Sequence, residues 1–406
     1  MRLLAILLSP PVPATAGHRV RNRSLLRALS LEGHEVRVLA YADAEEMASP
    51  APEITKLCAN YCMVPMPESR AAHRLRAAFG PMPYGAQRLA TPQMQTLICE
   101  ELASREFDAI LCDDIYLARN IPPENRVPVL LNKHDITCRI VRQFAASERN
   151  PLKKLYAHAE AAKIERLERA VCASVHSVAV CSMRDLELLR VIVPNARLAV
   201  ASNVIDVDKY RPSRVPREPG TVLFVGAMDW LPNQDGAEFL VMEILPRLRQ
   251  LVPTVRVILA GRNPSASLQR RFAEFPDVSF TGTVNDLRPV IARAAVCVVP
   301  LRIGSGTRLK ILEAAAMARP IVSTTLGAEG LELRQGVEIV HEDTPRKFAE
   351  AVAGLLRDVP RAEAMGRAAR AAVEERYSIP ALRCELRELL APLQDAPSAL
   401  TGSVRR

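Results

Sequence analysis

The sequence lacks several features that would place it in a large class of proteins. In its 406 residues no apolar run reaches the roughly 18 residues that a membrane-spanning helix needs. None of its nine cysteines stands in a CxxC pair, which disfavours a zinc site and indicates reduced, buried thiols in a cytoplasmic protein. The net charge of +9 forms no basic tail or stripe, so we expect no nucleic-acid partner.

Two common ligand-binding motifs are also missing. No GxGxxG follows the first expected strand, which argues against dinucleotide binding. No DxD-type cluster is placed to hold a metal, because Asp113-Asp114 is better explained as the end of a strand, so we expect neither metal nor cofactor. The apolar run at residues 3–8 is similar to a short signal peptide, but its small length and the helix directly after it favour a first buried strand.

Short apolar strands alternate with helices along both halves of the chain. Hydrophobic residues make up 49% of the sequence, which is enough for sizeable cores although only 4% are aromatic. Residues 211–220 contain three prolines and no periodicity, as in a linker. These features predict an α/β fold with two doubly wound Rossmann-like domains, residues 1–210 and 211–380, and a final helix within 381–395 that returns to the first domain.

The expected strands are short enough to be buried in parallel sheets. In the first half they lie at residues 2–8, 35–41, 61–64, 108–113, 127–131, 177–181 and 197–201. In the second half they lie at 221–225, 255–260, 278–281, 295–299, 320–324 and 337–340. A helix over residues 237–251 is expected to follow a loop at 226–236.

The segment 300–316 has the pattern of a strand, a glycine turn and a helix. Gly304 and Gly306 allow the backbone to turn and to approach a ligand closely. Thr307 is the expected N-cap of the following helix. Because a helix start presents free N–H groups and the positive end of the helix dipole, this segment predicts a phosphate site.

Charged residues follow the glycine turn. Arg308 and Lys310 add two cations to the first helical turn, where they are unfavourable unless an anion neutralises them. Glu313 lies further along the helix, where its carboxylate can accept hydrogen bonds from a sugar diol. The alternative is an ordinary turn between strand and helix with solvated charges, since glycine-rich turns are common.

Two residues of the first half follow expected strands and are candidate ligand contacts. Gly17 lies in the loop after the first strand, where it either approaches a phosphate or an acceptor or serves as a turn glycine. His134 follows the strand at 127–131 and either contacts a sugar, transfers a proton, or stands incidentally beside a helix-capping Asp135. Residues 69–79 form a short basic helix that suits either an anionic membrane surface or solvent.

Together these segments resemble the retaining nucleotide-sugar glycosyltransferases of family 4, which have the two-domain GT-B fold. The resemblance covers nearly the whole chain, its most specific part is 304–313, and it extends to the branch that builds bacterial exopolysaccharides. The other segments that carry it are 11–17, 21–36, 132–135, 203–206, 225–233, 260–264 and 280–287.

The resemblance implies that a nucleotide sugar binds mostly on the second domain. Glu313 would hold the ribose hydroxyls, and the Gly306-Thr307 backbone would lie near the diphosphate. Gly17 would approach the donor from the first domain, and His134 would meet the transferred sugar or the acceptor. The other donor-binding residues that it implies are Gly226 and Ser305, with Thr283, Val284 and Leu287 bordering the base.

Two departures from the family pattern affect the expected chemistry. Ser305 stands where the family has the first glutamate of an E-x7-E motif. The Arg and Lys that commonly follow the first strand of the second domain are missing, and Ala227 and Asn233 occupy that region. We therefore expect the cations of the later turn, Arg308 and Lys310, to neutralise the leaving diphosphate through bonds worth about 1.5–3 kcal/mol each.

The resulting hypothesis is a retaining hexosyltransferase. It would move a hexose from a nucleotide diphosphate sugar to a saccharide or lipid-linked acceptor in bacterial polysaccharide biosynthesis. The expected location is the cytoplasm, with peripheral contact to the inner membrane face as an option. The alternatives are a nucleotide-sugar 2-epimerase and, because of the altered E-x7-E motif, a non-catalytic nucleotide-sugar-binding subunit.

Overall fold

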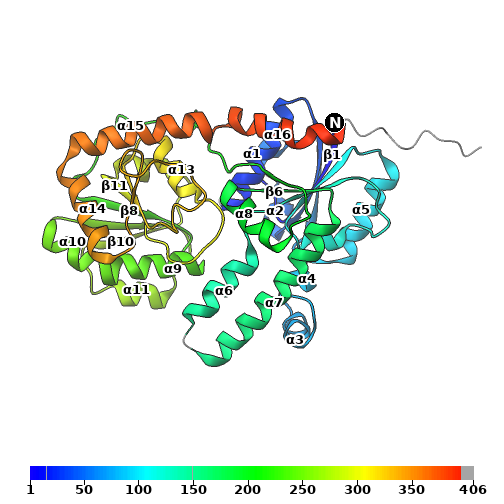
Figure 1. Ribbon diagram of the computed structural model, residues 1–406, viewed down its shortest axis with the longest axis horizontal. Coiled ribbons are helices and arrows are strands. Elements are labelled where there is room, and N and C mark those ends of the chain that lie inside the picture. Colours follow the sequence, from blue (N-terminus) through cyan, green and yellow to red (C-terminus); the bar gives the residue numbers. More distant parts are fainter. Residues whose placement is uncertain (15, 149, 395–406) are drawn as a thin grey trace, which may run out of the picture. The chain divides into compact units, whose positions relative to one another are not determined.

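A computed structural model describes residues 1–14, 16–148 and 150–394 of the chain (Figure 1). The chain divides into two compact units. The first contains residues 1–203 and the C-terminal helix that begins at Ile379, and the second contains Val204–Ser378. The proline-rich segment 211–220 therefore lies within the second unit, after the boundary.

Within the described residues, the first unit is built on a sheet of seven parallel strands. Their order is β3-β2-β1-β4-β5-β6-β7, so the strand order reverses between β1 and β4. The strands are short and mostly apolar, as expected where helices cover both faces. They are β1 (Arg2–Leu7), β2 (Glu35–Ala42), β3 (Asn60–Pro65), β4 (Ala109–Asp113), β5 (Val129–Asn132), β6 (Ser177–Val180) and β7 (Leu198–Val200).

Helices cover both faces of this sheet. Alternate residues of β1 serve the two faces: Leu4 and Ile6 join a core that includes Ile98 and Ile164, while Leu3 faces the C-terminal helix. The helices are α1 (Gly17–Leu31), α2 (Ala44–Ala48), α3 (Ala71–Phe79), α4 (Tyr84–Leu89), α5 (Pro92–Ser104), α6 (Thr137–Ser147), α7 (Pro151–Ser174), α8 (Met183–Ile192) and α16 (Ile379–Gln394), with 3-10 turns at Pro52–Lys56 and Leu117–Asn120.

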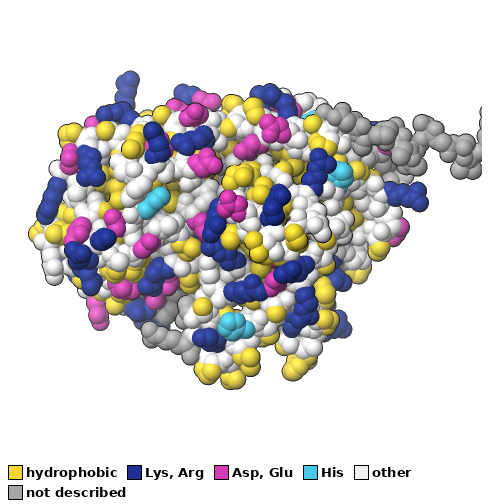
Figure 2. All heavy atoms as spheres, in the orientation of Figure 1, with side chains coloured by type: hydrophobic (Ala, Val, Ile, Leu, Met, Phe, Trp, Pro, Cys, Tyr) yellow, Lys and Arg dark blue, Asp and Glu magenta, His cyan; other side chains and the backbone are white. Residues whose placement is uncertain are grey.

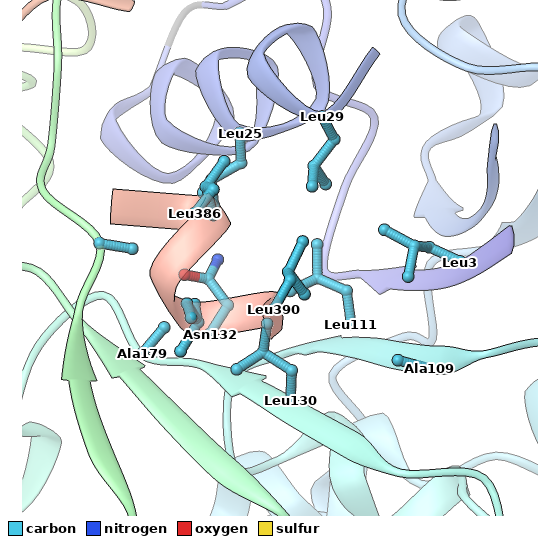
Figure 3. A pocket seen from close by; sticks show the side chains of 12 residues that line it. Leu3, Leu25, Leu29, Ala109, Leu111, Leu130, Asn132, Ala179, Leu386 and Leu390 are labelled. Carbon is cyan, nitrogen blue, oxygen red and sulfur yellow. The ribbon is translucent and has the colours of Figure 1, made fainter. Parts of the chain in front are cut away.

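Helix α16 packs beside α1 on one face of the sheet, and Figure 3 shows the apolar side chains at this contact. Leu386 and Leu390 of α16 lie near Leu25 and Leu29 of α1 (Figure 3). The void between them measures only about 10 Å³, room for a single water at most. We therefore interpret this void as a small packing gap under α16 and not as a ligand site.

The second unit has its own sheet and core. Its six parallel strands, counted over the described residues, have the order β10-β9-β8-β11-β12-β13, which reverses between β8 and β11. The strands are β8 (Thr221–Val225), β9 (Arg256–Ala260), β10 (Val278–Gly282), β11 (Val296–Val299), β12 (Ile321–Ser323) and β13 (Val340–His341). The helices are α9 (Leu231–Glu238), α10 (Leu245–Leu251), α11 (Ala266–Phe272), α12 (Arg288–Arg293), α13 (Leu309–Ala316), α14 (Pro345–Arg357) and α15 (Val359–Arg376).

The helix expected over residues 237–251 begins earlier than the sequence suggested. It starts as α9 at Leu231, continues through the π-helical stretch Phe239–Ile244 and ends as α10. Pro232 occupies the first turn, where a missing N–H and a fixed φ suit a helix start. In the sequence, the polar residues after Pro232 make this helix start look like a loop. Asn233, which was expected in that loop, lies in helix α9.

Two further expectations were wrong at the ends of elements. Helix α13 begins at Leu309, so Arg308 occupies the N-cap position expected for Thr307, and no side chain caps the helix. The strand expected at 337–340 is only Val340–His341, because Gly336 N donates to Ile339 O at 2.7 Å and closes a turn before it.

Among the described helices, none combines the length and the apolar character that a bilayer crossing requires.

Candidate functional site

Several of the residues predicted to bind ligands follow strands at or next to the point where the strand order of each sheet reverses. In open α/β sheets the carboxyl ends of the two strands at such a point leave a crevice that ligands occupy. In the second unit, Gly226 follows β8 and the turn with Gly304 and Gly306 follows β11. In the first unit, Gly17 opens the helix after β1, and His134 follows β5, next to β4.

The glycine turn after β11 is closed by the side chain of Arg308. Gly304 has φ +146°, a backbone conformation in which any other residue is strained, and a Cβ there would meet the Arg308 guanidinium. The buried guanidinium donates to the carbonyl oxygens of Ser305 and Gly306. Arg308 therefore ties the turn to the start of α13, and its predicted contact with a diphosphate stays a prediction.

Lys310 is the cation that stands in the helix start itself. Its ammonium donates to Asn233 Oδ1 at 2.7 Å and lies 4.6 Å from the centroid of the Phe224 ring. Burial and the charge of Arg308 lower the pKa of Lys310 to about 7, although Glu313 acts in the opposite direction. An amine so poised gains charge when an anion arrives, which is the behaviour expected of a phosphate contact.

Asn233 is held against the end of β8. Its Nδ2 donates to Ala227 O at 2.9 Å, which leaves Oδ1 for Lys310. A Cβ on Gly226 would lie 2.6 Å from the Asn233 side chain, so glycine is needed for this approach. The sequence placed Asn233 where the family has a cation, and the structure shows this amide bound to the cation supplied by α13.

Glu313 faces a tyrosine that the sequence did not single out. Tyr210 donates its hydroxyl to Glu313 Oε1 at 3.2 Å. Burial raises the pKa of Glu313 to about 7, against the opposing effects of this hydrogen bond and of Lys310. Burial and the Glu313 carboxylate also raise the pKa of Tyr210, so the phenol stays protonated and donates.

The loop predicted to border a base lies near the same tyrosine. Thr283 is exposed, and Val284 and Leu287 are half-buried. Arg288, which directly follows this loop, donates to the carbonyl oxygen of Lys209 at 3.2 Å and forms two-pronged contacts with Asp286. Because Lys209 precedes Tyr210, these contacts connect the loop with Glu313, and its role at a base stays a prediction.

In the first unit, His134 forms a close pair with Asp113. Its Nε2 lies 2.5 Å from Asp113 Oδ1, and Asp113 is fully buried. Burial alone would lower the pKa of His134, but the charge and hydrogen bond of Asp113 raise it overall. The other carboxylate oxygen accepts from Asn22 Nδ2 at 2.8 Å and from Leu8 N at 3.3 Å. The arrangement favours an imidazolium beside a carboxylate.

A second histidine, missed from the sequence, stands beside this pair. His18 Nε2 lies 2.8 Å from Ser9 Oγ, and the His18 and His134 rings meet edge to face with centroids 6.3 Å apart. His18 follows Gly17, which is exposed at the start of α1. Only the topology reveals this contact, because the two histidines lie far apart in the sequence.

Buried charges hold the segment that carries His134. The Arg21 side chain donates to Asn132 Oδ1 at 2.9 Å and to Asn203 Oδ1 at 3.0 Å. The Lys133 ammonium donates to Glu168 Oε1 at 2.9 Å, and both side chains are almost fully buried. These buried contacts fix the backbone on which His134 stands and so keep its side chain in place at the sheet edge.

The described residues include no group of three or more His, Cys, Asp or Glu side chains arranged to hold a metal ion. The described residues therefore form two polar sites without such a metal cluster: the site of Asp113 and His134 in the first unit, and the site of Lys310 and Glu313 in the second.

Comparison with known proteins finds a match to part of the second unit and a relative that covers most of the chain. Residues 219–358 match the family model described as "Glycosyl transferases group 1", and this range contains Gly226, Lys310 and Glu313. A Klebsiella pneumoniae protein described as "Uncharacterized 44.6 kDa protein in cps region" is 18% identical over 372 residues, which cover 88% of this chain and 92% of that protein.

Solved structures show the fold. Sucrose-phosphate synthase from Thermosynechococcus elongatus has a TM-score of 0.74 at 18% identity, covering 97% of this chain and 99% of that one. Anabaena HepE in complex with UDP and glucose has a TM-score of 0.68 at 14% identity, covering 97% and 100%. The fold is GT-B, which confirms that prediction, and the group 1 match together with these neighbours supports a glycosyltransferase enzyme.

Proposed function

We propose that the chain is a retaining family 4 glycosyltransferase that moves a hexose from a nucleotide diphosphate sugar to a saccharide or lipid-linked acceptor in bacterial polysaccharide synthesis. The group 1 match supports the reaction class. The cps region named for the Klebsiella relative supports the pathway, and the UDP and glucose named for HepE support the donor class. The comparisons favour neither the epimerase nor the non-catalytic subunit.

The observation that carries the proposal is the state of Lys310. A half-buried amine with a pKa of about 7, close to the Arg308 guanidinium, lies at the start of the helix after β11. When the bond between the anomeric carbon and the diphosphate oxygen breaks, negative charge grows on the diphosphate. A cation that binds this charge better in the transition state lowers the barrier.

The other groups take roles that fit their surroundings. Glu313, buried beside Tyr210, is assigned to the ribose hydroxyls, which can replace the phenol as donors. The acceptor oxygen bonds to the anomeric carbon on the face that the diphosphate leaves, and the acceptor proton departs with the diphosphate. We assign His134, held by Asp113, to the transferred sugar or the acceptor.

The experiment is titration calorimetry with UDP, GDP and TDP sugars on the full chain. We expect one base class to bind, and Lys310→Met to weaken that binding at least about tenfold, because a charge-assisted bond is worth about 1.5–3 kcal/mol. Lys347→Met, which removes an exposed lysine on α14, is the matched control. If no nucleotide sugar binds, or if Lys310→Met binds as tightly as the control, the proposal is wrong.

Product analysis separates transfer from other reactions of the same donor. With acceptor saccharides present, NMR of the new glycosidic bond should show the anomeric configuration of the donor. A 2-epimerised donor formed without acceptor would contradict the proposal.

A further inference from the structure

Helices α3 and α7 of the first unit carry apolar side chains on faces turned to solvent. Phe79 is 87% exposed and Leu152 is 76% exposed, values far from those of core residues. On α3, Leu75 and Phe79 are four residues apart and share one helix face. On α7, Leu155 and Tyr156 follow Leu152 by three and four residues, a spacing that places them beside it on the helix surface, and all three are exposed.

Polar contacts join α3 and α4 to the middle of α7. The Lys163 ammonium of α7 donates to the carbonyl oxygens of Ala77 and Ala78 at the end of α3. Glu160 Oε1 accepts from Tyr84 N at 2.7 Å, which joins α4 to the same part of α7. The basic-apolar surface, as we name it, comprises Leu75, Phe79, Leu152, Leu155 and Tyr156 with the cations Arg70, Arg74, Arg76, Lys153 and Lys154.

The charge on this surface is predominantly positive. Arg70 has an acidic neighbour, Glu68, at 3.7 Å. Arg74, Arg76 and the two lysines of α7 form no ion pair with any other residue in the described ranges. Exposed apolar groups surrounded by unpaired cations are the pattern by which a protein attaches to an anionic lipid surface.

The fold places this surface beyond the carboxyl edge of the sheet. Strands β5 and β6 have four residues each and span about 13 Å. Helix α7, which runs back from α6 to the start of β6, has 24 residues and spans about 36 Å. Its first turns therefore project past the sheet, on the side where His134 lies, and Figure 1 shows α6 and α7 extending from it as a hairpin.

The shape of the region distinguishes a bilayer from a rigid partner. In Figure 2 the hydrophobic side chains lie on two protruding points at the lower edge, where α3 and the α6–α7 hairpin end, with Lys and Arg close by. Protruding apolar groups insert readily into a deformable bilayer, whereas a protein partner is usually met by a continuous patch or a groove.

We propose that the basic-apolar surface docks the first unit on an anionic lipid bilayer. The apolar side chains enter the headgroup region and the five cations contact lipid phosphates. The docking does not depend on any sugar chemistry, so it stands or falls independently of the proposed function.

The test is flotation of the full chain with vesicles of phosphatidylcholine, with and without phosphatidylglycerol. We expect binding only when phosphatidylglycerol is present, and release at about 1 M salt, where the Debye length is about 3 Å. Leu75→Ser/Phe79→Ser and, separately, Lys153→Glu/Lys154→Glu should each reduce the bound fraction at least about tenfold.

Matched controls carry the same kinds of change at the opposite edge of the sheet. Leu31→Ser/Val191→Ser replaces two exposed apolar residues at the ends of α1 and α8, and Arg126→Glu/Arg190→Glu reverses two exposed charges. We expect both controls to bind like the unmodified chain. Equal binding to both vesicle types, no binding to either, or equal losses in test and control variants would overturn the proposal. The proposal would also be overturned if the chain bound no vesicles but formed a dimer that Leu75→Ser/Phe79→Ser dissociates.

Discussion

Replacing Lys310 by methionine should make the second unit more stable at low pH, although it removes a proposed functional group. Burial and Arg308 lower the pKa of Lys310 from 10.5 to about 7. The folded chain therefore disfavours the charged amine, and below pH 7 it must hold that charge. Methionine keeps the contact with the Phe224 ring without the charge.

The magnitude follows from the two pKa values. At about 1.36 kcal/mol per pH unit, the fall from 10.5 to about 7 corresponds to about 5 kcal/mol. Lys310 is partly accessible, and solvent screening reduces this to about 2–3 kcal/mol. The methionine variant also loses the hydrogen bond to Asn233 and the cation–π part of the contact with the Phe224 ring, which together cost about 1 kcal/mol. The expected net gain is about 1–2 kcal/mol.

The pH dependence gives the prediction its sign. The penalty for the charged amine is fully present below the folded pKa of about 7 and fades as the pH rises toward the unfolded value of 10.5. By differential scanning fluorimetry, Lys310→Met should raise the melting temperature by about 2–8 °C at about pH 6. The gain should shrink at about pH 9.5.

A control and a ligand complete the design. Lys347→Met changes an exposed lysine of the same unit and should leave the melting temperature unaltered at both pH values. Adding the nucleotide sugar that binds should stabilise the unmodified chain more than the Lys310 variant. An equal or lower melting temperature of the variant at about pH 6 would refute the reasoning, as would a gain independent of pH.

Three other substitutions test the remaining contacts. Asp113→Asn should lower the pKa of His134, which NMR titration of the imidazole would show; an unchanged pKa would contradict the pair. Lys133→Met leaves the Glu168 carboxylate buried without its partner and should destabilise the first unit by about 3–5 kcal/mol in thermal unfolding, and a neutral outcome would contradict this. Gly226→Ala places a Cβ 2.6 Å from the amide next to it and should weaken calorimetric donor binding, so unaltered affinity would contradict that close approach.

The architecture could be predicted from the sequence because each strand is a short apolar run between helix and turn signals. Parallel βα units then leave few topologies to choose from. The start of α9 could not be placed from polarity, since the residues after Pro232 look like a loop. The true signal there is the proline itself, in the first helical turn.

The sequence suggested residues for the candidate sites but not the contacts that hold them. Lys310 and Glu313 stand three residues apart and were found together. Their partners were not: Asn233 is 77 residues from Lys310, and Tyr210 is 103 residues from Glu313. Such pairs follow from which strands are neighbours, and a single sequence does not specify that order.

The place of α16 in the first unit has a consequence for how the chain acquires its structure during synthesis. The second unit is one uninterrupted segment, so it can fold as soon as it leaves the ribosome, whereas the first unit lacks a helix until α16 has also been synthesised. Until then Leu25 and Leu29 stay uncovered. A nascent chain halted before Ile379 should therefore recruit chaperones through its earliest-made half, while its later-made half is already native.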